Sequence, residues 1–381
     1  MVKQLLIHII DSFMEVLIIG GGLSGSTLAR FLAENNVTVD VIEQRNNVGG
    51  NCSTVIKDNI IIHEHGAHIF HTNDKECWDF VNRFAEFETY NHIVKIDYGS
   101  GITSMPINLN TFNDLFGINT PNDARIYIEN ATKDYDEGTN FEEACLKKFG
   151  KVLYEMLIKP YSEKQWGKEC KDIPKHIVDR IPLRYSFDDR YFTDKYQGMP
   201  KSGYTNMIES MLSHSKINLT CDKKVVLDDI KSATKQWNFV VYCGALDELM
   251  GYEFGNLDYR SLKFETDRYS FDTIQGCAVL NKVNSEYTRS IEHKHFNSRE
   301  SEFTFITKEY PCSLVDGGVP YYPINDDLNN KLYDKYLSNV IGLLDYNFIP
   351  LGRLAEYKYY DMDKTISSAL KVGNKILNSF K

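Results

Sequence analysis

No stretch of this 381-residue chain is apolar over the roughly 18 residues that a membrane-spanning helix requires. We therefore expect no membrane segment. Residues 1–13 do not resemble a signal peptide either, because Asp11 interrupts their short apolar run and no small-residue cleavage site follows. Met14 directly precedes the first predicted strand. We treat residues 1–13 as an extension, and whether they belong to the native protein stays open.

The sequence also lacks paired cysteine spacing and an excess of positive charge. Its 8 cysteines are scattered and none forms a C-x-x-C pair, which is typical of reduced thiols in a cytoplasmic protein. The 53 acidic residues outnumber the 43 basic ones, and the formal net charge of −10 argues against a nucleic-acid partner. An anionic substrate would need a local cluster of Arg or Lys, because the overall field opposes it.

The first feature present is a βαβ unit. Glu15–Ile19 is an apolar run typical of a buried strand, and it ends in the glycine-rich turn 20–25. Apolar residues then recur at helical spacing up to Glu34, and Val37–Ile42 is a second strand. The Gly-x-Gly-x-x-Gly spacing lets backbone N–H groups approach a pyrophosphate, and Glu43 can bond a ribose hydroxyl. The pattern predicts dinucleotide binding, with a purely structural glycine turn as the alternative.

The residues after the second strand favour FAD over NAD. Glu43 is followed by Gln44-Arg45 and then by Gly49-Gly50. This pattern resembles the extended FAD-binding motif of flavin amine oxidases, disulfide reductase relatives and sugar mutases. Arg45 can neutralise phosphate charge, and the glycine pair lets the chain pass close to the cofactor. Gly352-Arg353 suits a second contact beside the ribityl chain.

The rest of the chain indicates a discontinuous domain. Segment 237–244 is an apolar strand that ends in glycine, far from the first unit. Residues 106–198 have a helical texture, with helix N-caps expected at Thr120 and Asn140. Alternation over 259–322 indicates a sheet. We predict an α/β fold: a discontinuous Rossmann-like FAD-binding domain with an inserted helical lobe and an inserted antiparallel β-sheet lobe. The predicted bounds are 14–85, 200–256 and 340–381 for the FAD-binding domain, 107–199 for the helical lobe, and 86–106 and 257–339 for the sheet lobe.

Four histidines close together in the sequence invite a metal site. His63, His65, His68 and His71 have spacings that imidazole ligands can use. No Cys or Asp cluster lies nearby to complete a ligand set, and the spacing is not H-E-x-x-H. We therefore predict no metal site and interpret most of these residues as hydrogen-bonded polar or surface histidines.

Longer segments resemble the UDP-galactopyranose mutase family, and they occur in the family's order over most of the chain. These segments are Gly66–Asp74, Tyr161–Gly167, Arg180–Arg184, Asp194–Gly198, Tyr287–Phe296, Tyr321–Pro323 and Gly352–Met362. The match departs from the family at the N-terminal extension and at Cys52 and Cys243.

The resemblance implies roles for individual residues. Arg180 and Arg289 would clamp a UDP diphosphate, since guanidinium groups suit phosphate oxygens, and His71 would lie against the flavin near the sugar; these three are the implied catalytic residues. The other implied substrate-binding residues are Tyr161, Trp166, Tyr191, Asn91, Tyr322 and Tyr359. The implied cofactor-binding residues are Gly20, Gly22, Leu23, Ser24, Gly25, Glu43, Gln44, Arg45, Gly50, Asn51, His68, Ile69, Gly352, Arg353, Tyr359, Asp361 and Met362. Arg184 either shares the role of Arg180 or flanks it.

The chemistry implied by the resemblance is an isomerisation without net redox change. UDP-galactopyranose and UDP-galactofuranose would interconvert through a covalent adduct between the anomeric carbon and N5 of reduced FAD. An unidentified cellular reductant would keep the flavin reduced, and the protein would be a cytoplasmic homodimer that serves cell-surface polysaccharide biosynthesis. UDP-N-acetylgalactosamine stays open as a substrate. Two other functions stay open from the residues alone: a flavin oxidase or desaturase, and a non-catalytic nucleotide-sugar binder.

Overall fold

The βαβ unit forms the centre of a parallel sheet in the computed structural model, which describes residues 14–297, 299–313, 318–344 and 346–379. The predicted extension, residues 1–13, lies outside the described residues. The strand order is β10-β2-β1-β11-β17, and all neighbours run parallel. The strands are β1 (Glu15–Ile19), β2 (Thr38–Ile42), β10 (Ile217–Thr220), β11 (Phe239–Tyr242) and β17 (Phe348–Pro350). The chain thus leaves this sheet after β2 and again after β11, and returns each time.

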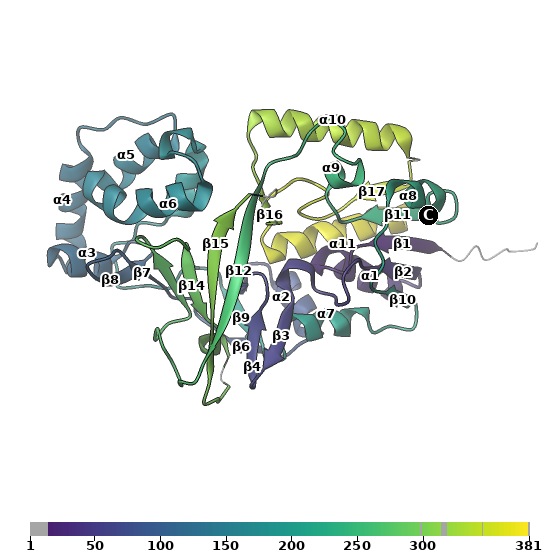
Figure 1. The fold of residues 1–381 in the computed structure, drawn as a ribbon, viewed down its shortest axis with the longest axis horizontal. Helices are drawn as coiled ribbons and strands as arrows, with labels where there is room; N and C mark the ends of the chain where they lie inside the picture. Colours follow the sequence, from purple (N-terminus) through teal and green to yellow (C-terminus); the bar gives the residue numbers. More distant parts are fainter. Residues whose placement is uncertain (1–13, 298, 314–317, 345, 380–381) are drawn as a thin grey trace, which may run out of the picture.

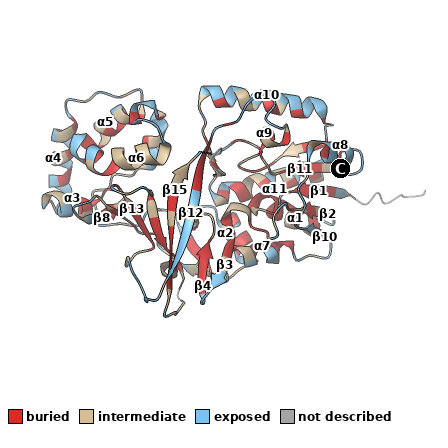
Figure 2. Ribbon diagram, viewed as in Figure 1, coloured by how far each residue is buried: buried red, intermediate tan, exposed pale blue. Residues whose placement is uncertain are grey.

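Both faces of the parallel sheet are covered, which explains why β1 is continuously apolar from Val16 to Ile19. Val16 and Ile18 belong to one buried cluster, while Leu17 and Ile19 belong to another. The sequence spacing predicted this strand at its observed bounds. Figure 2 shows buried residues concentrated in these strands, whereas much of helix α10 is exposed.

Helices pack on each face of the parallel sheet (Figure 1). One buried cluster contains residues of α1, α7 and α11, and the other contains residues of α8, α9 and α10. No helix among the described residues combines the length and the apolar character needed to cross a membrane. The bounds are α1 (Leu23–Glu34), α2 (Lys75–Asn82), α7 (Tyr204–Leu212), α8 (Leu227–Ala233), α9 (Leu246–Leu249), α10 (Asp327–Leu343) and α11 (Met362–Asn378).

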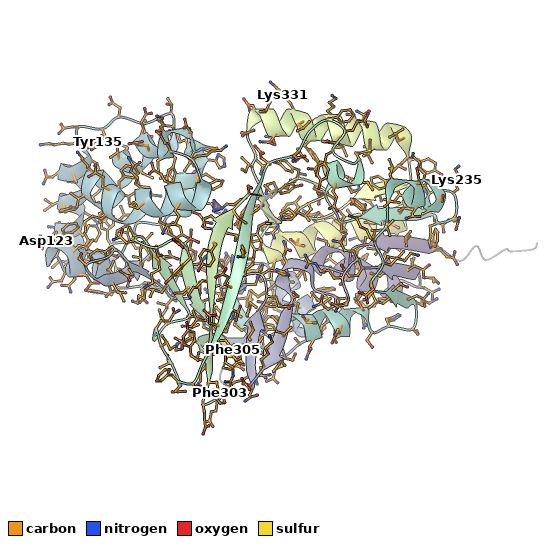
Figure 3. The ribbon with its side chains drawn as sticks, viewed as in Figure 1. Asp123, Tyr135, Lys235, Phe303, Phe305 and Lys331 are labelled. Atoms are coloured by element: carbon orange, nitrogen blue, oxygen red, sulfur yellow. The ribbon has the colours of Figure 1, made fainter. Side chains whose placement is uncertain are left out.

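A helical lobe with its own buried core lies at the opposite end of the molecule from the parallel sheet (Figure 1). The predicted N-caps hold: Thr120 accepts a hydrogen bond from the N–H of Asp123, and Asn140 accepts one from Glu143. Figure 3 labels Asp123 and Tyr135 on this lobe, Lys235 on the far side of the molecule, and Lys331 between them on α10. Its elements are α3 (Leu109–Phe116), α4 (Pro121–Thr132), α5 (Phe141–Leu153), η2 (Tyr154–Ile158), α6 (Lys159–Trp166), η3 (Cys170–Asp172) and η4 (Lys175–Arg180).

A seven-stranded sheet lies between the two ends, and its described strand pairs are antiparallel, as predicted, with one exception. Its order is β16-β12-β15-β14-β13-β7-β8, and the pair β13–β7 runs parallel. These two strands are far apart in sequence, so no hairpin forces them to run antiparallel. The strands are β7 (Val94–Asp97), β8 (Ile102–Met105), β12 (Tyr259–Tyr269), β13 (Val279–Lys282), β14 (Arg289–Glu292), β15 (Thr304–Cys312) and β16 (Val319–Pro323).

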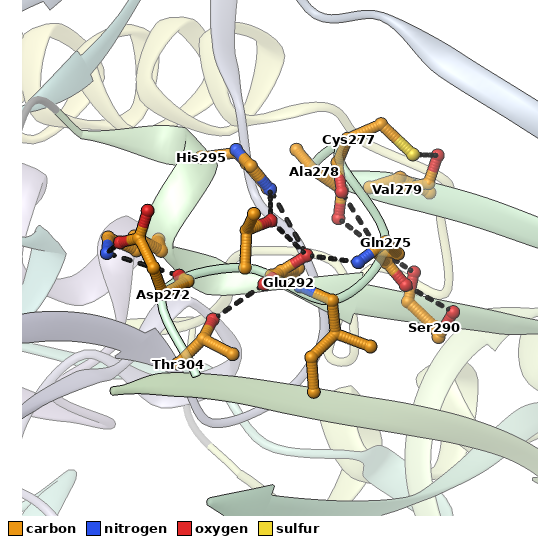
Figure 4. A network of polar contacts seen from close by, with 12 residues as sticks. Asp272, Gln275, Cys277, Ala278, Val279, Ser290, Glu292, His295 and Thr304 are labelled. Atoms are coloured by element: carbon orange, nitrogen blue, oxygen red, sulfur yellow. Dashed lines mark hydrogen bonds and ion pairs between the residues drawn. The ribbon is translucent and has the colours of Figure 1, made fainter. Parts of the chain in front are cut away.

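A buried carboxylate fastens the loop before β13 to this sheet (Figure 4). Glu292 is fully buried and accepts hydrogen bonds from the N–H groups of Ile274 and Gln275, from Oγ1 of Thr304 and from the ring of His295. Burial alone would raise the pKa of Glu292, but these hydrogen bonds lower it to about 2. The carboxylate is therefore ionised and holds the loop in place.

Two small sheets and two short helices complete the fold, and they show where the predicted lobe boundaries differ from the observed elements. Strand β9 falls almost wholly within the predicted helical lobe, yet it pairs with β5 and β6. The predicted boundary between 339 and 340 falls inside α10, whose buried residues pack with the parallel sheet. The remaining elements are β3 (Thr54–Lys57), β4 (Ile60–His63), β5 (Phe70–Thr72), β6 (Phe87–Thr89), β9 (Tyr196–Pro200), η1 (Gly50–Cys52) and η5 (His293–Phe296).

Candidate functional site

A cavity of about 650 Å³ extends from the carboxyl ends of the parallel strands to the helical lobe and the seven-stranded sheet. Open α/β sheets bind ligands at this edge. The residues predicted from the sequence line it, with Asn91 and Gly352 as exceptions. Those at the parallel-sheet end are Gly20, Gly22, Leu23, Ser24, Gly25, Glu43, Gln44, Arg45, Gly50, Asn51, His68, Ile69, Arg353, Asp361 and Met362. Those at the other end are His71, Tyr161, Trp166, Arg180, Tyr191, Arg289, Tyr322 and Tyr359.

The glycine turn leaves the N-terminus of α1 open to the cavity. A Cβ atom on Gly25 would lie 2.0 Å from the carbonyl oxygen of Gly20, so only glycine fits there. The N-cap residue of α1, Gly22, has no side chain to bond the first N–H groups of the helix. Unpaired N–H groups and the helix dipole together favour an anion at this position. The turn therefore has the form that a pyrophosphate needs.

Glu43 shapes the same turn while facing the cavity. Its Oε2 accepts the N–H of Gly21 at 2.7 Å, and its Oε1 accepts the N–H of Arg45 at 2.9 Å. Each carboxylate oxygen has a second lone pair, which leaves room to accept a ribose hydroxyl. Arg45 itself donates to the carbonyl of Gly50 at 3.0 Å, and so it joins the turn to the glycine pair that follows β2.

Gly352 contributes backbone geometry and does not line the cavity. Its φ of +92° is a left-handed conformation, and a Cβ atom there would lie 2.5 Å from Oγ of Ser24. The chain thus passes directly over the start of α1. Arg353, the next residue, lines the cavity and lies 5.1 Å above the ring of Tyr321. This glycine is needed for a close approach of backbone to α1.

Arg180, on η4, forms a stack with two cavity residues, Tyr322 on β16 and Tyr359 in the C-terminal segment. Nη2 of Arg180 donates to the hydroxyl of Tyr359 at 2.7 Å, and its guanidinium lies 4.0 Å from the centre of that ring. The rings of Tyr359 and Tyr322 stack with centroids 4.8 Å apart. Burial raises the pKa of Tyr359, so its hydroxyl keeps its proton. The stack presents one cation and two hydroxyl groups to the cavity.

Arg289 is held by a buried carboxylate that the sequence analysis missed. Its Nε donates to Oε2 of Glu309 at 2.5 Å, and the side chain of Glu309 is only 2% exposed. Burial disfavours the charge of Arg289, but Glu309 raises its pKa well above the ordinary value. Gly66 makes space for this pair, since a Cβ atom there would lie 2.7 Å from Oε1 of Glu309. The glutamate fixes the guanidinium at the cavity wall.

Arg260, on β12, is a second cavity residue that the sequence analysis missed. It is 6% exposed and lines the cavity, and its Nε and Nη2 have no hydrogen-bond partner among the described residues. Its guanidinium lies 5.4 Å from the centre of the Trp166 ring. Burial lowers the pKa of Arg260 to about 10, so it stays charged at neutral pH. No local signal in the sequence marks Arg260, because β12 also carries charged residues such as Lys263 and Glu265.

The structure does not place Asn91 in the cavity. Its side chain is exposed, whereas the next residue, His92, is buried and lines the cavity. Successive side chains of an extended segment point in opposite directions, so only one of the two can face inward. Burial, and then the charge of Arg289, lowers the pKa of His92 to about 3, which keeps its imidazole neutral.

Arg184 flanks the site and does not line it. Its Nη1 donates to the carbonyl oxygens of Asp188 and Arg190, and its Nη2 donates to that of Tyr191 at 3.3 Å. All of these acceptors lie in the segment that leads to the cavity residue Tyr191. Arg184 therefore orders this segment from outside.

The four clustered histidines have different side-chain partners, and no group of three or more metal-ligating side chains occurs among the described residues. His63 is buried and stacks on His293 with ring centroids 5.8 Å apart. Nδ1 of His68 donates to the carbonyl of Gly66 at 2.9 Å, and burial lowers the pKa of His68 to about 3. His65 lies 3.3 Å from Nη1 of Arg45. His71 pairs with Asp194.

Lys164 joins α6 to the turn between β13 and β14. Its ammonium group donates to the backbone carbonyl oxygens of that turn at 2.6 to 3.2 Å, from Lys282, Val283, Ser285 and Tyr287. Burial lowers the pKa of Lys164. The helix that carries Tyr161 and Trp166 is thus attached to the strands that carry Asn281 and Arg289.

Comparison with known proteins gives consistent matches along the chain. A family model described as UDP-galactopyranose mutase matches residues 156–359. A second model, described as an NAD(P)-binding Rossmann-like domain, matches residues 18–84. The first therefore covers the helical lobe from within η2 to η4, strands β12 to β16 of the seven-stranded sheet and the return to the C-terminal segment, and the second covers the glycine turn.

Two relatives match over nearly their whole length. A Klebsiella pneumoniae protein named "Probable UDP-galactopyranose mutase" is 40% identical over 373 residues, which cover 96% of this chain and 95% of that protein. The dTDP-fucopyranose mutase of Escherichia coli is 37% identical over 376 residues, covering 96% and 99%. The crystal structure of a reduced UDP-galactopyranose mutase has a TM-score of 0.74 at 13% identity, covering 96% and 94%. At that identity the structural likeness concerns the fold.

Proposed function

The chain belongs to the UDP-galactopyranose mutase family, an isomerase family, and from that premise we propose that it interconverts UDP-galactopyranose and UDP-galactofuranose. The observation that carries the proposal is the composition of one continuous cavity. A pyrophosphate turn lies at one end, and arginines and tyrosines lie at the other. A dinucleotide cofactor and a nucleotide sugar can therefore meet in one space.

FAD is the cofactor that we propose for the parallel-sheet end. The open N-terminus of α1, the free lone pairs of Glu43 and the close passage of Gly352 over Ser24 all fit a dinucleotide whose pyrophosphate lies on the glycine turn. When bound in its reduced form, FAD would supply a nucleophilic N5 for the anomeric carbon of the sugar. The chain then has to bind, orient and retain the nucleotide sugar.

For the diphosphate of UDP we propose Arg180 and Arg289, with the hydroxyls of Tyr191, Tyr322 and Tyr359. The two guanidinium groups come from different elements, η4 and β14, so they can hold a diphosphate between them. This local positive charge offsets the net charge of −10. The clamp also retains UDP while it is detached from the sugar, which allows it to return to the anomeric carbon.

Tyr161 and Trp166 are proposed to lie along the uridine. Both belong to α6 and line the cavity, and their rings offer flat surfaces for a base. We further propose that the protein is a cytoplasmic homodimer and that a cellular reductant supplies electrons to the flavin. UDP-N-acetylgalactosamine is a further substrate to test.

The test is turnover of UDP-galactose by purified, flavin-loaded protein with and without dithionite, with products separated by chromatography. A UDP-galactofuranose peak only under reducing conditions is the expected result. Turnover that consumes oxygen without forming the furanose would replace the proposal with an oxidase. A reduced protein that binds UDP and converts no sugar would identify a non-catalytic binder.

A second candidate substrate comes from the Escherichia coli relative, which is named dTDP-fucopyranose mutase and is nearly as similar as the Klebsiella protein. The same assay with dTDP-fucopyranose, run at matched concentrations, compares kcat/KM for the two nucleotide sugars. A higher kcat/KM for UDP-galactose is expected. A ratio that favours dTDP-fucose would keep the mutase chemistry and change the substrate.

A further inference from the structure

His71, Asp194 and Asn73 are joined in a series of hydrogen bonds that fixes the orientation of each side chain. Nδ1 of His71 is 2.8 Å from Oδ2 of Asp194, and Oδ1 of Asp194 accepts from Nδ2 of Asn73 at 2.5 Å. Oδ1 of Asn73 accepts the backbone N–H of Lys195 at 2.9 Å. Because a backbone N–H can only donate, the amide oxygen of Asn73 is fixed, and its NH₂ group must face Asp194.

This arrangement fixes which ring nitrogen of His71 carries a proton. An ionised carboxylate has only acceptors, so the hydrogen atom between the two groups belongs to Nδ1. A neutral imidazole has one N–H, and Nε2 is then an acceptor with an unshared lone pair. Nε2 has no hydrogen-bond partner among the described residues, and His71 lines the cavity. The lone pair is therefore available to a ligand in the cavity.

The ring of His71 is also held in its plane. Phe192 stacks on it with ring centroids 3.7 Å apart and an angle of 14° between the planes. His71 lies opposite Gln197 in the pair β5–β9, and Nε2 of Gln197 donates to the carbonyl of Asp194 at 2.8 Å. The backbone around both partners is thus fixed, which is the support that a positioned proton carrier requires.

We propose that Asp194 is a positioning residue that holds His71 as the proton carrier for the sugar; this rests on the proposed mutase function. The pyranose has O5 in its ring and a free hydroxyl on C4, whereas the furanose has O4 in its ring and a free hydroxyl on C5. Each conversion therefore removes one proton from O4 and adds one to O5. No electrons are gained or lost overall.

Nε2 of His71 can perform both transfers. It accepts the hydroxyl proton from O4 as the bond between O4 and the anomeric carbon forms. It gives a proton to O5 when the bond between O5 and the anomeric carbon breaks. Because the ring opens before it closes again, the imidazolium first gives its Nε2 proton to O5 and then regains a proton from O4. Asp194 stabilises the imidazolium, and between the two transfers it holds the neutral imidazole with its proton on Nδ1.

The other charged and titratable groups near His71 do not compete for this role. His92 also contacts the ring of Phe192, with centroids 5.9 Å apart, and burial keeps its imidazole neutral. Arg289 acts on His92 from β14, and its charge is paired with Glu309. Among the described residues, Asp194 is the carboxylate in contact with His71.

The first experiment compares Asp194→Asn with Asp188→Asn in the flavin-loaded, reduced protein. Asp188 lies in the same segment but pairs with Arg190. We expect Asp194→Asn to lower kcat for UDP-galactose by about 10²- to 10³-fold, and KM to stay within about threefold of the wild-type value. Asp188→Asn is expected to leave both unchanged, and Asp194→Glu to recover part of kcat. A wild-type kcat in Asp194→Asn would overturn the proposal.

The second experiment needs no turnover. In the flavin-loaded protein with nitrogen-15 in its histidine rings, long-range proton–nitrogen NMR spectra report the tautomer, and the His71→Gln variant identifies the signals of His71. The wild type is expected to carry its proton on Nδ1, and Asp194→Asn to shift the population toward Nε2–H. A wild-type His71 with an unprotonated Nδ1, or a tautomer that Asp194→Asn does not alter, would refute the positioning role.

The two experiments separate failure of this inference from failure of the proposed function. If the wild type converts neither UDP-galactose nor dTDP-fucopyranose, the mutase function fails and the proton transfer fails with it. The NMR result would still decide whether Asp194 sets the tautomer of His71. If the wild type is active and both Asp194 results are negative, only the inference fails.

Discussion

Replacement of Arg260 by methionine is expected to change stability and ligand affinity in opposite directions. The guanidinium is 6% exposed, and its Nε and Nη2 have no partner among the described residues. Each buried donor left without a partner costs about 1–3 kcal/mol. Methionine fills a similar volume without these donors, and exchange of a buried charge for an apolar side chain is often neutral or stabilising. Without nucleotide, Arg260→Met should unfold at the same or a higher temperature.

UDP should bind more weakly to Arg260→Met than to the wild type. A hydrogen bond to a charged group contributes about 1.5–3 kcal/mol, and each 1.4 kcal/mol corresponds to a tenfold change in the dissociation constant. If a phosphate of UDP satisfies Arg260, its loss should raise the dissociation constant by roughly 10- to 150-fold. Titration calorimetry with UDP on the flavin-loaded protein measures this directly, and urea or thermal unfolding measures stability.

Arg125→Met is the matched control. Arg125 is exposed on α4 and lies over the ring of Tyr185 in the helical lobe, and it does not line the cavity. The Arg125→Met substitution removes the same charge from the protein and is expected to leave the affinity for UDP unchanged. If Arg260→Met binds UDP as tightly as the control does, Arg260 does not meet the ligand. A clear loss of stability without nucleotide would show that its buried nitrogens are satisfied in solution.

Three further predictions concern other parts of the molecule. Arg289→Ala should lose most mutase activity while it keeps its bound flavin, measured by turnover and by flavin absorbance; full activity would remove Arg289 from the proposed clamp. Lys164→Met removes a donor shared by four carbonyl groups, of which that of Tyr287 keeps Oγ of Ser285, and should lower the free energy of unfolding by about 1–3 kcal/mol in a urea titration; an unchanged midpoint would mean that water replaces the ammonium. Burial lowers the pKa of His293 to about 3, compared with 6.5 in the unfolded chain. Between pH 3 and pH 6.5 the unfolded chain therefore binds more protons than the folded protein does, and the folded protein loses stability as the pH falls below 6.5. Lowering the pH from 6.5 to 5 should reduce the free energy of unfolding by about 2 kcal/mol through this histidine alone. Urea titrations at both pH values measure this, and the same pH dependence in His293→Asn as in the wild type would contradict the assignment.

Local signals in the sequence were sufficient for β1, α1, β2 and β11 of the parallel sheet and for the starts of two helices in the helical lobe. The run Glu15–Ile19 became β1 at its predicted bounds, and the caps at Thr120 and Asn140 start helices where predicted. Each of these features depends on residues that are adjacent in the chain, and those residues strongly favour a buried strand or the start of a helix. The strand predicted over 237–244 lies beside β1, which agrees with the prediction that the parallel sheet is built from separated segments.

Features that depend on contacts between distant segments were harder to predict. The parallel pairing of β13 with β7 and the continuity of α10 past residue 339 are set by packing and have no local signature. The pairing of Asp194 with His71 has the same origin, because the two residues are joined only through β5 and β9. Asn91 and His92 show the same difficulty for single residues. A resemblance between motifs does not tell which of two adjacent side chains faces the cavity.

The ammonium of Lys164 couples the nucleotide end of the cavity to the seven-stranded sheet. It fastens α6 to the β13–β14 turn, so Tyr161 and Trp166 stay in a constant relation to Arg289. The helix ends at Gly167, whose φ is +61° and whose N–H donates to the carbonyl of Glu163 at 2.7 Å. Cys170, Ile173 and Val178 beyond it are buried in the core of the helical lobe, so the segment that leads to Arg180 is held by that lobe. A nucleotide therefore meets aromatic and cationic groups that are already oriented, which lowers the entropic cost of binding.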